Sequence, residues 1–347
     1  MRYTIKAGSI ANIATDCLVV AVWNKGSLSD EARELDQAAN KALSNLIKSG
    51  DFSGKLGETL FLYNADEVKA KRILLVGAGL KSRFTAKHAQ RLLKAAARVL
   101  SRSQASSAHF ALGSAECKDR DAYWLASQLA QACEDATYRY TVTKSKKGKP
   151  VALKAVSVSP AAGARRKQLQ DALKTGQAIG SGINTAKALG NLPGNICTPS
   201  YLAEQARELA NKQKSITTQV LTEKQMARLG MGSFLSVSAG SVEEGKLIIM
   251  QYKGGAAKDK PYALVGKGIT FDTGGISLKP GLAMDEMKFD MCGAASVFGI
   301  MTALAELKLP INVVGMVAAA ENMPSGKATK PGDIVTSMSG KTIEILN

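Results

Sequence analysis

The sequence predicts an α/β protein with two domains, and three observations indicate this. Short apolar runs alternate with segments of helical periodicity along the chain, as in α/β domains. The 347 residues are enough for two domains that each bury a core. Hydrophobic residues make up 45% and charged residues 22%, and no apolar run approaches the roughly 20 residues of a membrane span, which predicts a soluble protein.

The first half of the chain is predicted to form a mostly parallel sheet covered by helices. CLVVAVW (17–23) and RILLVGAG (72–79) are continuous apolar runs, typical of buried strands. Residues 29–50 open at a Ser or Asp cap and close at a glycine, which predicts one helix. The alternation is completed by predicted strands 58–64, 107–113, 137–144 and 151–159 and predicted helices 85–100 and 119–136.

A second αβ series is predicted after a long helix at 165–189. Pro193 and Pro199 mark a loop beyond that helix. We therefore expect an N-terminal domain at 1–164, a linker helix and loop at 165–194, and a C-terminal domain at 195–347. The predicted elements of the second domain are helices 201–212 and 293–307 and strands 247–254, 262–269 and 311–322.

Cysteine and histidine usage limits the kinds of site that the chain can build. Five cysteines are scattered without a CxxC pair, which indicates reduced thiols. The two histidines, His88 and His109, both lie in the first half, so a metal site in the second half must use mainly carboxylate oxygen. The N-terminus has no basic flank followed by an apolar core, so we expect no signal peptide and a cytoplasmic location.

The net charge of +17 is spread along the chain, with one dense run, KSKKGK (144–149), that we interpret as a solvated loop. A charge of this size also permits binding to nucleic acid through phosphates. A DNA-binding or architectural protein is therefore an alternative function. Its test is the salt dependence of DNA retention.

The stretch from Tyr262 to Val297 is rich in apolar residues and glycine, and four of its seven charged residues are the candidates for a polar site: Lys267, Asp272, Lys279 and Asp290. Charged side chains are rarely buried unless they are paired or bind a metal. Glycines around them let the backbone approach a ligand closely. Spacing alone leaves two interpretations open, a pair of structural salt bridges or a metal or phosphate site.

The same stretch resembles a known family. VGKGITFDTGGISLKP followed by MDEMKFDMCGAASV is similar to the signature of the leucyl aminopeptidase family, the cytosol aminopeptidases with two metal ions. Three further blocks resemble successive parts of that family's catalytic domain, at 190–206, 237–254 and 318–347. The resemblance implies an N-terminal macro-like α/β domain and a C-terminal α/β/α catalytic domain with a mixed sheet.

The resemblance implies a metalloprotease of peptide catabolism that removes N-terminal residues, preferably leucine, from peptides with a free N-terminus. Two divalent metal ions are expected to activate the attacking water, with manganese expected first and zinc or magnesium as alternatives. A phosphate-ester hydrolase using the same carboxylates is disfavoured by the match to the aminopeptidase blocks. The family generally forms hexamers, and some bacterial members also bind DNA, so a hexamer and DNA are further expected partners.

The resemblance also assigns roles to five residues. Asp272 and Asp290 correspond to metal ligands, and ionised carboxylates are hard oxygen donors that suit this role. Lys267 corresponds to an unusual lysine ligand, which must lose its proton to coordinate a cation. Lys279 corresponds to the catalytic lysine, expected to stay charged and to donate a hydrogen bond to the oxyanion. Met287 resembles a wall of the pocket for the first substrate side chain, with core packing as the competing interpretation.

In the family, the strand at 341–347 runs directly into a segment with an aspartate ligand, a glutamate ligand and a catalytic arginine. No counterpart of that segment occurs in this sequence. We therefore expect the chain to be C-terminally truncated, as a fragment of a longer aminopeptidase or as a truncated gene product, and favour the fragment. With one side of the metal cage missing, we expect the chain alone to be inactive.

Overall fold

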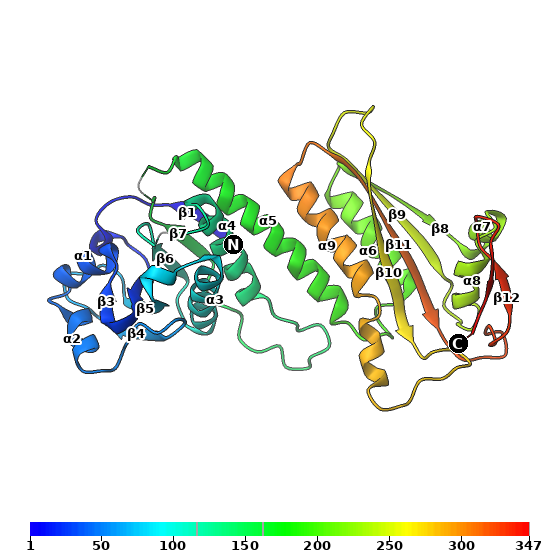
Figure 1. Ribbon diagram of the computed structural model, residues 1–347, viewed down its shortest axis with the longest axis horizontal. Helices are drawn as coiled ribbons and strands as arrows, with labels where there is room; N and C mark the ends of the chain where they lie inside the picture. The colour runs from blue at the N-terminus through cyan, green and yellow to red at the C-terminus, as the bar shows by residue number, and fades with distance from the viewer. Residues whose placement is uncertain (116, 162, 347) are drawn as a thin grey trace. The chain divides into compact units, whose positions relative to one another are not determined.

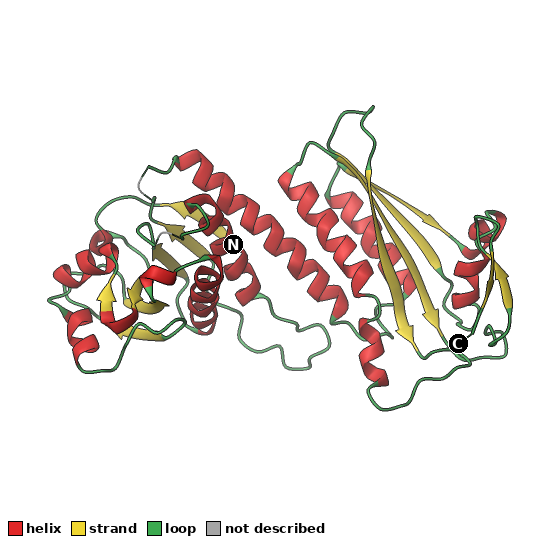
Figure 2. Ribbon diagram, viewed as in Figure 1, coloured by secondary structure: helices red, strands yellow, loops and turns green. Residues whose placement is uncertain are grey.

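The computed structural model describes residues 1–115, 117–161 and 163–346, which divide into two compact units (Figures 1 and 2). Unit 1 comprises Met1–Arg139 and Lys146–Gly180, and unit 2 comprises Tyr140–Ser145 and Ser181–Asn347. Helix α5 (Arg166–Gly190) contributes residues to both units, so the linker predicted at 165–194 overlaps a helix that the units share. The domain boundaries at 164 and 194 stay predictions.

Unit 1 is a sheet with helices on both faces. Its strand order is β1-β7-β6-β2-β5-β4, with β3 paired to β2, and the pairs from β1 through β5 are parallel while β4 and β3 are antiparallel to their neighbours. The mostly parallel sheet predicted for the first half is confirmed. The strands are β1 (Arg2–Ile5), β2 (Cys17–Trp23), β3 (Ser27–Leu28), β4 (Thr59–Tyr63), β5 (Arg72–Gly79), β6 (Ser107–Ala111) and β7 (Ala155–Val158). The α-helices besides α5 are α1 (Asp30–Ala38), α2 (Ala42–Lys48), α3 (Ala86–Arg102) and α4 (Ala122–Thr137).

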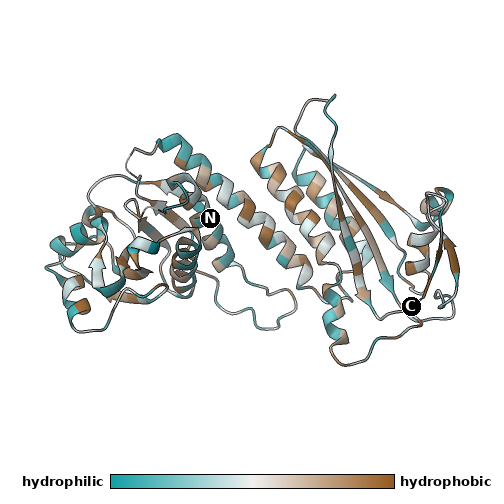
Figure 3. Cartoon of the chain, in the orientation of Figure 1, coloured by the Kyte–Doolittle hydropathy of each residue, from teal (hydrophilic) through white to brown (hydrophobic). Residues whose placement is uncertain are grey.

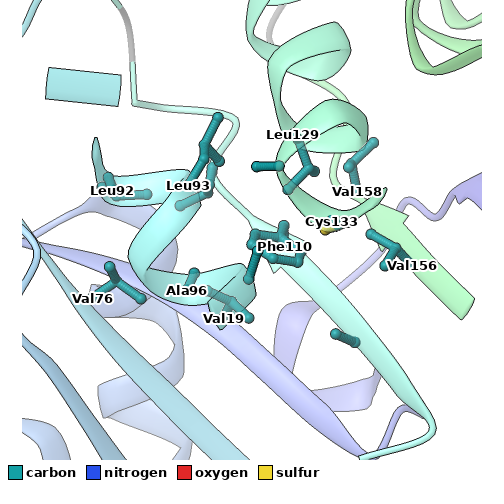
Figure 4. Packing of buried hydrophobic residues seen from close by; sticks show 14 of the residues in the cluster. Val19, Val76, Leu92, Leu93, Ala96, Phe110, Leu129, Cys133, Val156 and Val158 are labelled. Carbon is teal, nitrogen blue, oxygen red and sulfur yellow. The ribbon is translucent and has the colours of Figure 1, made fainter. Parts of the chain in front are cut away.

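The continuous apolar run of β2 follows from burial on both faces of this sheet. Val19 packs into a cluster with α3 and α4, whereas Val20 packs into a cluster with α1 and α2. Figure 4 shows the first cluster, in which Leu93 of α3 and Leu129 of α4 approach Phe110 of β6. Because neither face of β2 meets solvent, apolar residues are not interrupted by polar ones along the strand. The apolar run in the sequence therefore has the same bounds as the strand in the structure.

Two predicted elements of unit 1 differ from the structure. The single helix predicted at 29–50 is two helices, because Asn40 and Lys41 adopt left-handed φ values of 49° and 59° between α1 and α2. The Asp36 carboxylate accepts the N–H of Ser44 at 2.9 Å and so holds the second helix against the first. The segment 137–144, predicted as a strand, has no strand conformation, and Tyr140–Ser145 belongs to unit 2.

Unit 2 is built on a mixed four-stranded sheet with the order β10-β11-β9-β8. The β10–β11 pair is parallel, and the β11–β9 and β9–β8 pairs are antiparallel. A separate hairpin pairs β12 with β13. The strands are β8 (Ile216–Leu221), β9 (Lys246–Lys253), β10 (Tyr262–Asp272), β11 (Asn312–Asn322), β12 (Ile334–Thr336) and β13 (Thr342–Glu344). The α-helices are α6 (Pro199–Lys212), α7 (Glu223–Arg228), α8 (Gly232–Ser238) and α9 (Cys292–Leu307). Four 3-10 helices complete the described chain: η1 (Ile10–Asn12), η2 (Asn24–Gly26), η3 (Lys81–Arg83) and η4 (Met284–Phe289).

Helices α6 and α9 cover one face of the unit 2 sheet, and Figure 3 shows hydrophobic residues along α9. Phe298 and Met301 of α9 form a cluster with Leu202 of α6 and Val317 of β11. By length and composition, Met284–Leu307 could cross a membrane, but 56% of its apolar window is buried inside the protein, as expected of a core helix. The helix therefore anchors the sheet that carries the charged residues.

Candidate functional site

Strand β10 carries two of the four charged residues on one face of its sheet. Lys267 lies opposite Ala318 of β11, and Asp272 lies opposite Asn322. A β-bulge inside β10 inserts one extra residue, so five steps along β10 match four steps along β11. Because side chains alternate between faces, this bulge is what brings Lys267 and Asp272 to the same side.

The Asp272 carboxylate is surrounded by three hydrogen-bond donors. Its Oδ1 accepts from the backbone N–H of Gly274 at 2.9 Å and from the side-chain amide of Asn322 at 2.8 Å. Its Oδ2 accepts from the Lys279 ammonium at 2.6 Å. Burial by itself would raise the pKa of Asp272, but the three donors together outweigh burial and lower that pKa below its ordinary value. Asp272 is therefore ionised at neutral pH.

A glycine turn returns Lys279 to the end of β10. Gly274 has a φ of 88°, and a Cβ there would lie 2.4 Å from a backbone oxygen, so a larger residue does not fit. Beyond the turn, the Lys279 N–H donates to Thr273 O at 2.9 Å. The Lys279 ammonium lies 3.2 Å from Met287 Sδ. The turn thus brings Asp272, Lys279 and Met287 together, although the sequence separates them.

Lys267 and Asp290 form the second pair, with Nζ and Oδ2 3.2 Å apart. Close packing of β10 on the start of α9 sets this pair: a Cβ on Gly266 would lie 2.7 Å from Gly293 O. Asp290 Oδ2 is buried and has no hydrogen-bond partner among the described residues, so its contact with Lys267 is an ion pair by distance rather than an aligned hydrogen bond. A buried carboxylate oxygen without a donor is unfavourable unless a cation approaches it.

The donor set fits one side of a divalent metal site. Asp272 and Asp290 supply carboxylate oxygens, and Oδ2 of Asp290, which contacts the Lys267 ammonium without an aligned hydrogen bond, is an atom that a metal cation would satisfy in its place. Within residues 1–115, 117–161 and 163–346, however, no three Asp, Glu, His or Cys side chains gather closely enough to hold a metal ion. The described residues thus supply two carboxylates and a lysine.

The sequence did not single out Asn322 and Thr273, which both take part in this site. Thr273 donates to Asn322 O twice, from Oγ1 at 2.8 Å and from its N–H at 3.0 Å. The available signal was the position of Asn322, a polar residue at the carboxyl end of an apolar strand, where ligands of α/β sheets often bind. Its pairing with Asp272 depends on the bulge, which the apolar pattern does not reveal.

Two family profiles match the chain, one in each half. The profile of the cytosol aminopeptidase family, catalytic domain, matches residues 184–347. The profile of the cytosol aminopeptidase family, N-terminal domain, matches residues 19–147. The four charged residues all lie within the match to the catalytic domain.

Curated proteins and solved structures show the same similarity. The chain is 47% identical over 348 residues to a probable cytosol aminopeptidase of Alkalilimnicola ehrlichii, covering 100% of the chain and 70% of that protein. It is 47% identical over 347 residues to a cytosol aminopeptidase of Pseudomonas aeruginosa, with the same coverage. A tomato leucine aminopeptidase mutant superposes with a TM-score of 0.85 at 30% identity, covering 100% of this chain and 68% of that one. The bottromycin maturation enzyme BotP in complex with Mn gives a TM-score of 0.76 at 29% identity, covering 95% and 65%.

Proposed function

Because the chain belongs to the cytosol aminopeptidase family, whose enzymes are metal-dependent aminopeptidases, we propose that its cluster in unit 2 forms part of a two-metal centre that removes N-terminal leucine from peptides. The observation that supports this most is the convergence of Lys267, Asp272, Lys279 and Asp290 in two close pairs. We assign manganese first, because BotP is described with Mn, and keep zinc or magnesium as alternatives. A cytoplasmic location agrees with the names of the relatives.

Asp272, Asp290 and a deprotonated Lys267 are the proposed metal-holding residues. When bound, divalent ions supply a water of lowered pKa and polarise the peptide carbonyl. The protein holds Asp272 in place through donors to both carboxylate oxygens, so its orientation is fixed before any ligand arrives. The Asp290 oxygen, which no described residue satisfies with a hydrogen bond, would accept a metal cation in place of the Lys267 ammonium.

Lys279 is the proposed catalytic residue. Its ammonium donates to Asp272 Oδ2 at 2.6 Å and is about one third exposed, so it can reach both the carboxylate and an incoming substrate. We propose that it stays charged and donates to the oxyanion that develops on the scissile carbonyl. A single donor of this kind contributes about 10²–10³-fold to turnover in enzymes that stabilise an oxyanion.

Met287 is the proposed wall of the pocket for the first side chain of the substrate. Its thioether contacts the Lys279 ammonium, so the pocket wall and the catalytic group lie side by side. An unbranched, flexible methionine suits an apolar side chain such as leucine. Met287→Ala is expected to shift preference from leucine toward larger N-terminal residues while leaving the Lys279 ammonium in place.

We also propose that this 347-residue chain has no peptidase activity by itself, because its described residues supply only two carboxylates for two ions. Peptides with a free N-terminus are the proposed substrates, and a hexamer is the proposed assembly of the active enzyme. Manganese-dependent release of leucine from a leucyl peptide by the purified chain would contradict the inactivity proposal.

The test of the catalytic assignment joins this chain to the segment that follows the corresponding strand in a longer relative. We expect that fusion to release leucine in a manganese-dependent way and the Lys279→Ala variant to lose at least about 10²-fold in kcat. Lys288→Ala, a lysine on the neighbouring η4, serves as the matched control and should retain activity. Full activity of Lys279→Ala, with folding verified by circular dichroism, would remove Lys279 from the mechanism.

A second candidate function, DNA binding, is favoured by the surface of α3. The helix has no acidic residue, and its exposed face carries five cations at helical spacing: Lys87, Arg91, Lys94, Arg98 and Arg102. A groove of about 420 Å³ beside its C-terminal end is lined by three of them, by Arg139 and by the single acidic residue Asp135. A row of cations at this spacing suits the phosphates of a nucleic acid backbone.

This second candidate is tested by retention of duplex DNA at several salt concentrations. Neutralising Arg98 and Arg102 together should flatten the slope of log affinity against log salt by about 2, since each phosphate contact contributes roughly 0.9. Neutralising Lys174 and Lys212, on α5 and α6, is the charge-matched control. Absence of retention at low salt, or equal slopes in both double variants, would remove the candidate.

A further inference from the structure

We propose that Asn322 is a positioning residue that fixes the orientation of the Asp272 carboxylate for metal binding. The inference rests on the function proposed above, in which Asp272 holds a metal ion. Asn322 itself is not proposed as a ligand. Its side-chain amide acts on the carboxylate, and the carboxylate acts on the cation.

The hydrogen bonds around Asp272 divide the two carboxylate oxygens into different roles. Oδ1 accepts two bonds from neutral N–H donors, the Asn322 amide at 2.8 Å and the Gly274 backbone at 2.9 Å. Within the described chain, Oδ2 accepts one bond, from the Lys279 ammonium at 2.6 Å, and Lys279 lies on a turn rather than on the sheet. The two Oδ1 donors therefore fix the plane of the carboxylate, while Oδ2 keeps capacity for another contact.

Asn322 is itself held by the backbone. Its carbonyl oxygen accepts two bonds from Thr273, at 2.8 and 3.0 Å, so the end of β11 is tied to the residue that follows Asp272. On the other side, a Cβ at Gly275 would lie 2.8 Å from Asn322 Oδ1. The absence of a side chain at Gly275 therefore leaves the space that the Asn322 amide occupies.

The register between β10 and β11 places Asn322 beside Asp272. Without the bulge in β10, continuing the pairing of Ile269 with Ala320 would place Asp272 opposite Met323, which carries no amide donor. With the bulge, Asp272 lies opposite Asn322 at the carboxyl ends of two parallel strands. Bulges commonly re-aim side chains beside active sites, and this one supplies Asp272 with its donor.

The test compares two variants that each remove one side-chain contact between β10 and β11. Asn322→Ala removes the amide donor to Asp272, whereas Thr270→Val removes the bond from Thr270 Oγ1 to Ala320 O at 3.3 Å without touching Asp272. Manganese affinity of the 347-residue chain is measured by the electron paramagnetic resonance signal of free Mn²⁺, and stability by urea unfolding. Loss of such an outer partner typically weakens metal binding by about 10–100-fold.

We expect Asn322→Ala to weaken manganese binding by about tenfold or more and Thr270→Val to bind like the unmodified chain. Equal affinities in all three proteins, or equal losses in both variants, would overturn the inference, because the link between strands would then explain the effect. If the unmodified chain binds no manganese, the proposed metal site fails separately. In that case crystal structures decide, because an Asp272 carboxylate with unchanged orientation in Asn322→Ala overturns the inference, and a rotated one supports it.

Discussion

Replacing Gly266 by alanine tests whether close packing of β10 on α9 sets the site. A Cβ at Gly266 would lie 2.7 Å from Gly293 O and 2.8 Å from Ala294 Cα. Both are backbone atoms at the start of α9, which no side-chain rotation can move. Ordinary contact begins at about 3.4 Å, so the strand and the helix must separate, and Lys267 must move relative to Asp290.

We expect Gly266→Ala to lower the free energy of unfolding of unit 2 by about 1–3 kcal/mol, the usual range for overpacking a core. Alanine also restricts the unfolded chain, which stabilises by about 0.4–1 kcal/mol and reduces the net loss. Urea unfolding followed by far-ultraviolet circular dichroism measures the change. The two tryptophans, Trp23 and Trp124, both lie in unit 1, so their fluorescence follows the other unit in the same titration.

Gly281→Ala is the matched control for this experiment. A Cβ at Gly281 would have no atom of the described residues within 4 Å, and the φ of Gly281 does not lie in the left-handed region. The control should be as stable as the unmodified chain or slightly more stable, because only the effect on the unfolded state remains. Equal stability of Gly266→Ala and Gly281→Ala would refute the packing argument.

Three further predictions concern other parts of the chain. Burial lowers the pKa of His109 to about 4, so between pH 6.5 and 4 the unfolded histidine binds a proton while the folded one stays neutral. The free energy of unfolding should therefore fall by roughly 3 kcal/mol as the pH drops from about 6.5 to 4. The His109→Asn variant should lose this pH dependence in urea unfolding. Asp290→Asn should weaken manganese binding measured by calorimetry by at least about tenfold, whereas Asp285→Asn on the neighbouring η4 should not; equal affinities would contradict the role of Asp290. Gly299→Ala would place a Cβ 2.5 Å from Gly182 O, where α9 packs on α5. The melting temperature should fall, because the clash outweighs the gain of about 1 kcal/mol in helix propensity. A raised melting temperature would contradict this packing.

The sequence predicts a strand best where the strand is buried on both faces and is therefore apolar along its whole length. Strands β2 and β5 are buried on both faces and appear as continuous apolar runs, so the predicted and observed bounds agree. The segment 137–144 shows why a pattern fails when burial is absent. Its tyrosines and threonines alternate as in a strand, but among the described residues the segment pairs with no strand, and none of its residues is buried.

The candidate site was predictable in its residue types but not in its geometry. Lys267, Asp272, Lys279 and Asp290 are visible as charges inside apolar sequence, and their metal-binding and catalytic roles stay predictions. The pairing of Lys267 with Asp290 depends on the close packing of β10 on α9, and the pairing of Lys279 with Asp272 depends on a glycine turn. Asn322 was not predicted as a site residue, because its contact with Asp272 depends on the register that the bulge creates.

An anomalous diffraction map from crystals of this chain grown with manganese tests the central claim most directly. The account predicts a manganese peak within coordination distance, about 2.0–2.4 Å, of carboxylate oxygens of Asp290 or Asp272, with Lys267 Nζ turned toward it. Because the described chain supplies only two carboxylates, we expect partial occupancy that rises with manganese concentration. Crystals saturated with manganese that show no peak at either carboxylate, or peaks only elsewhere on the protein, would contradict the assignment of this cluster as a metal site.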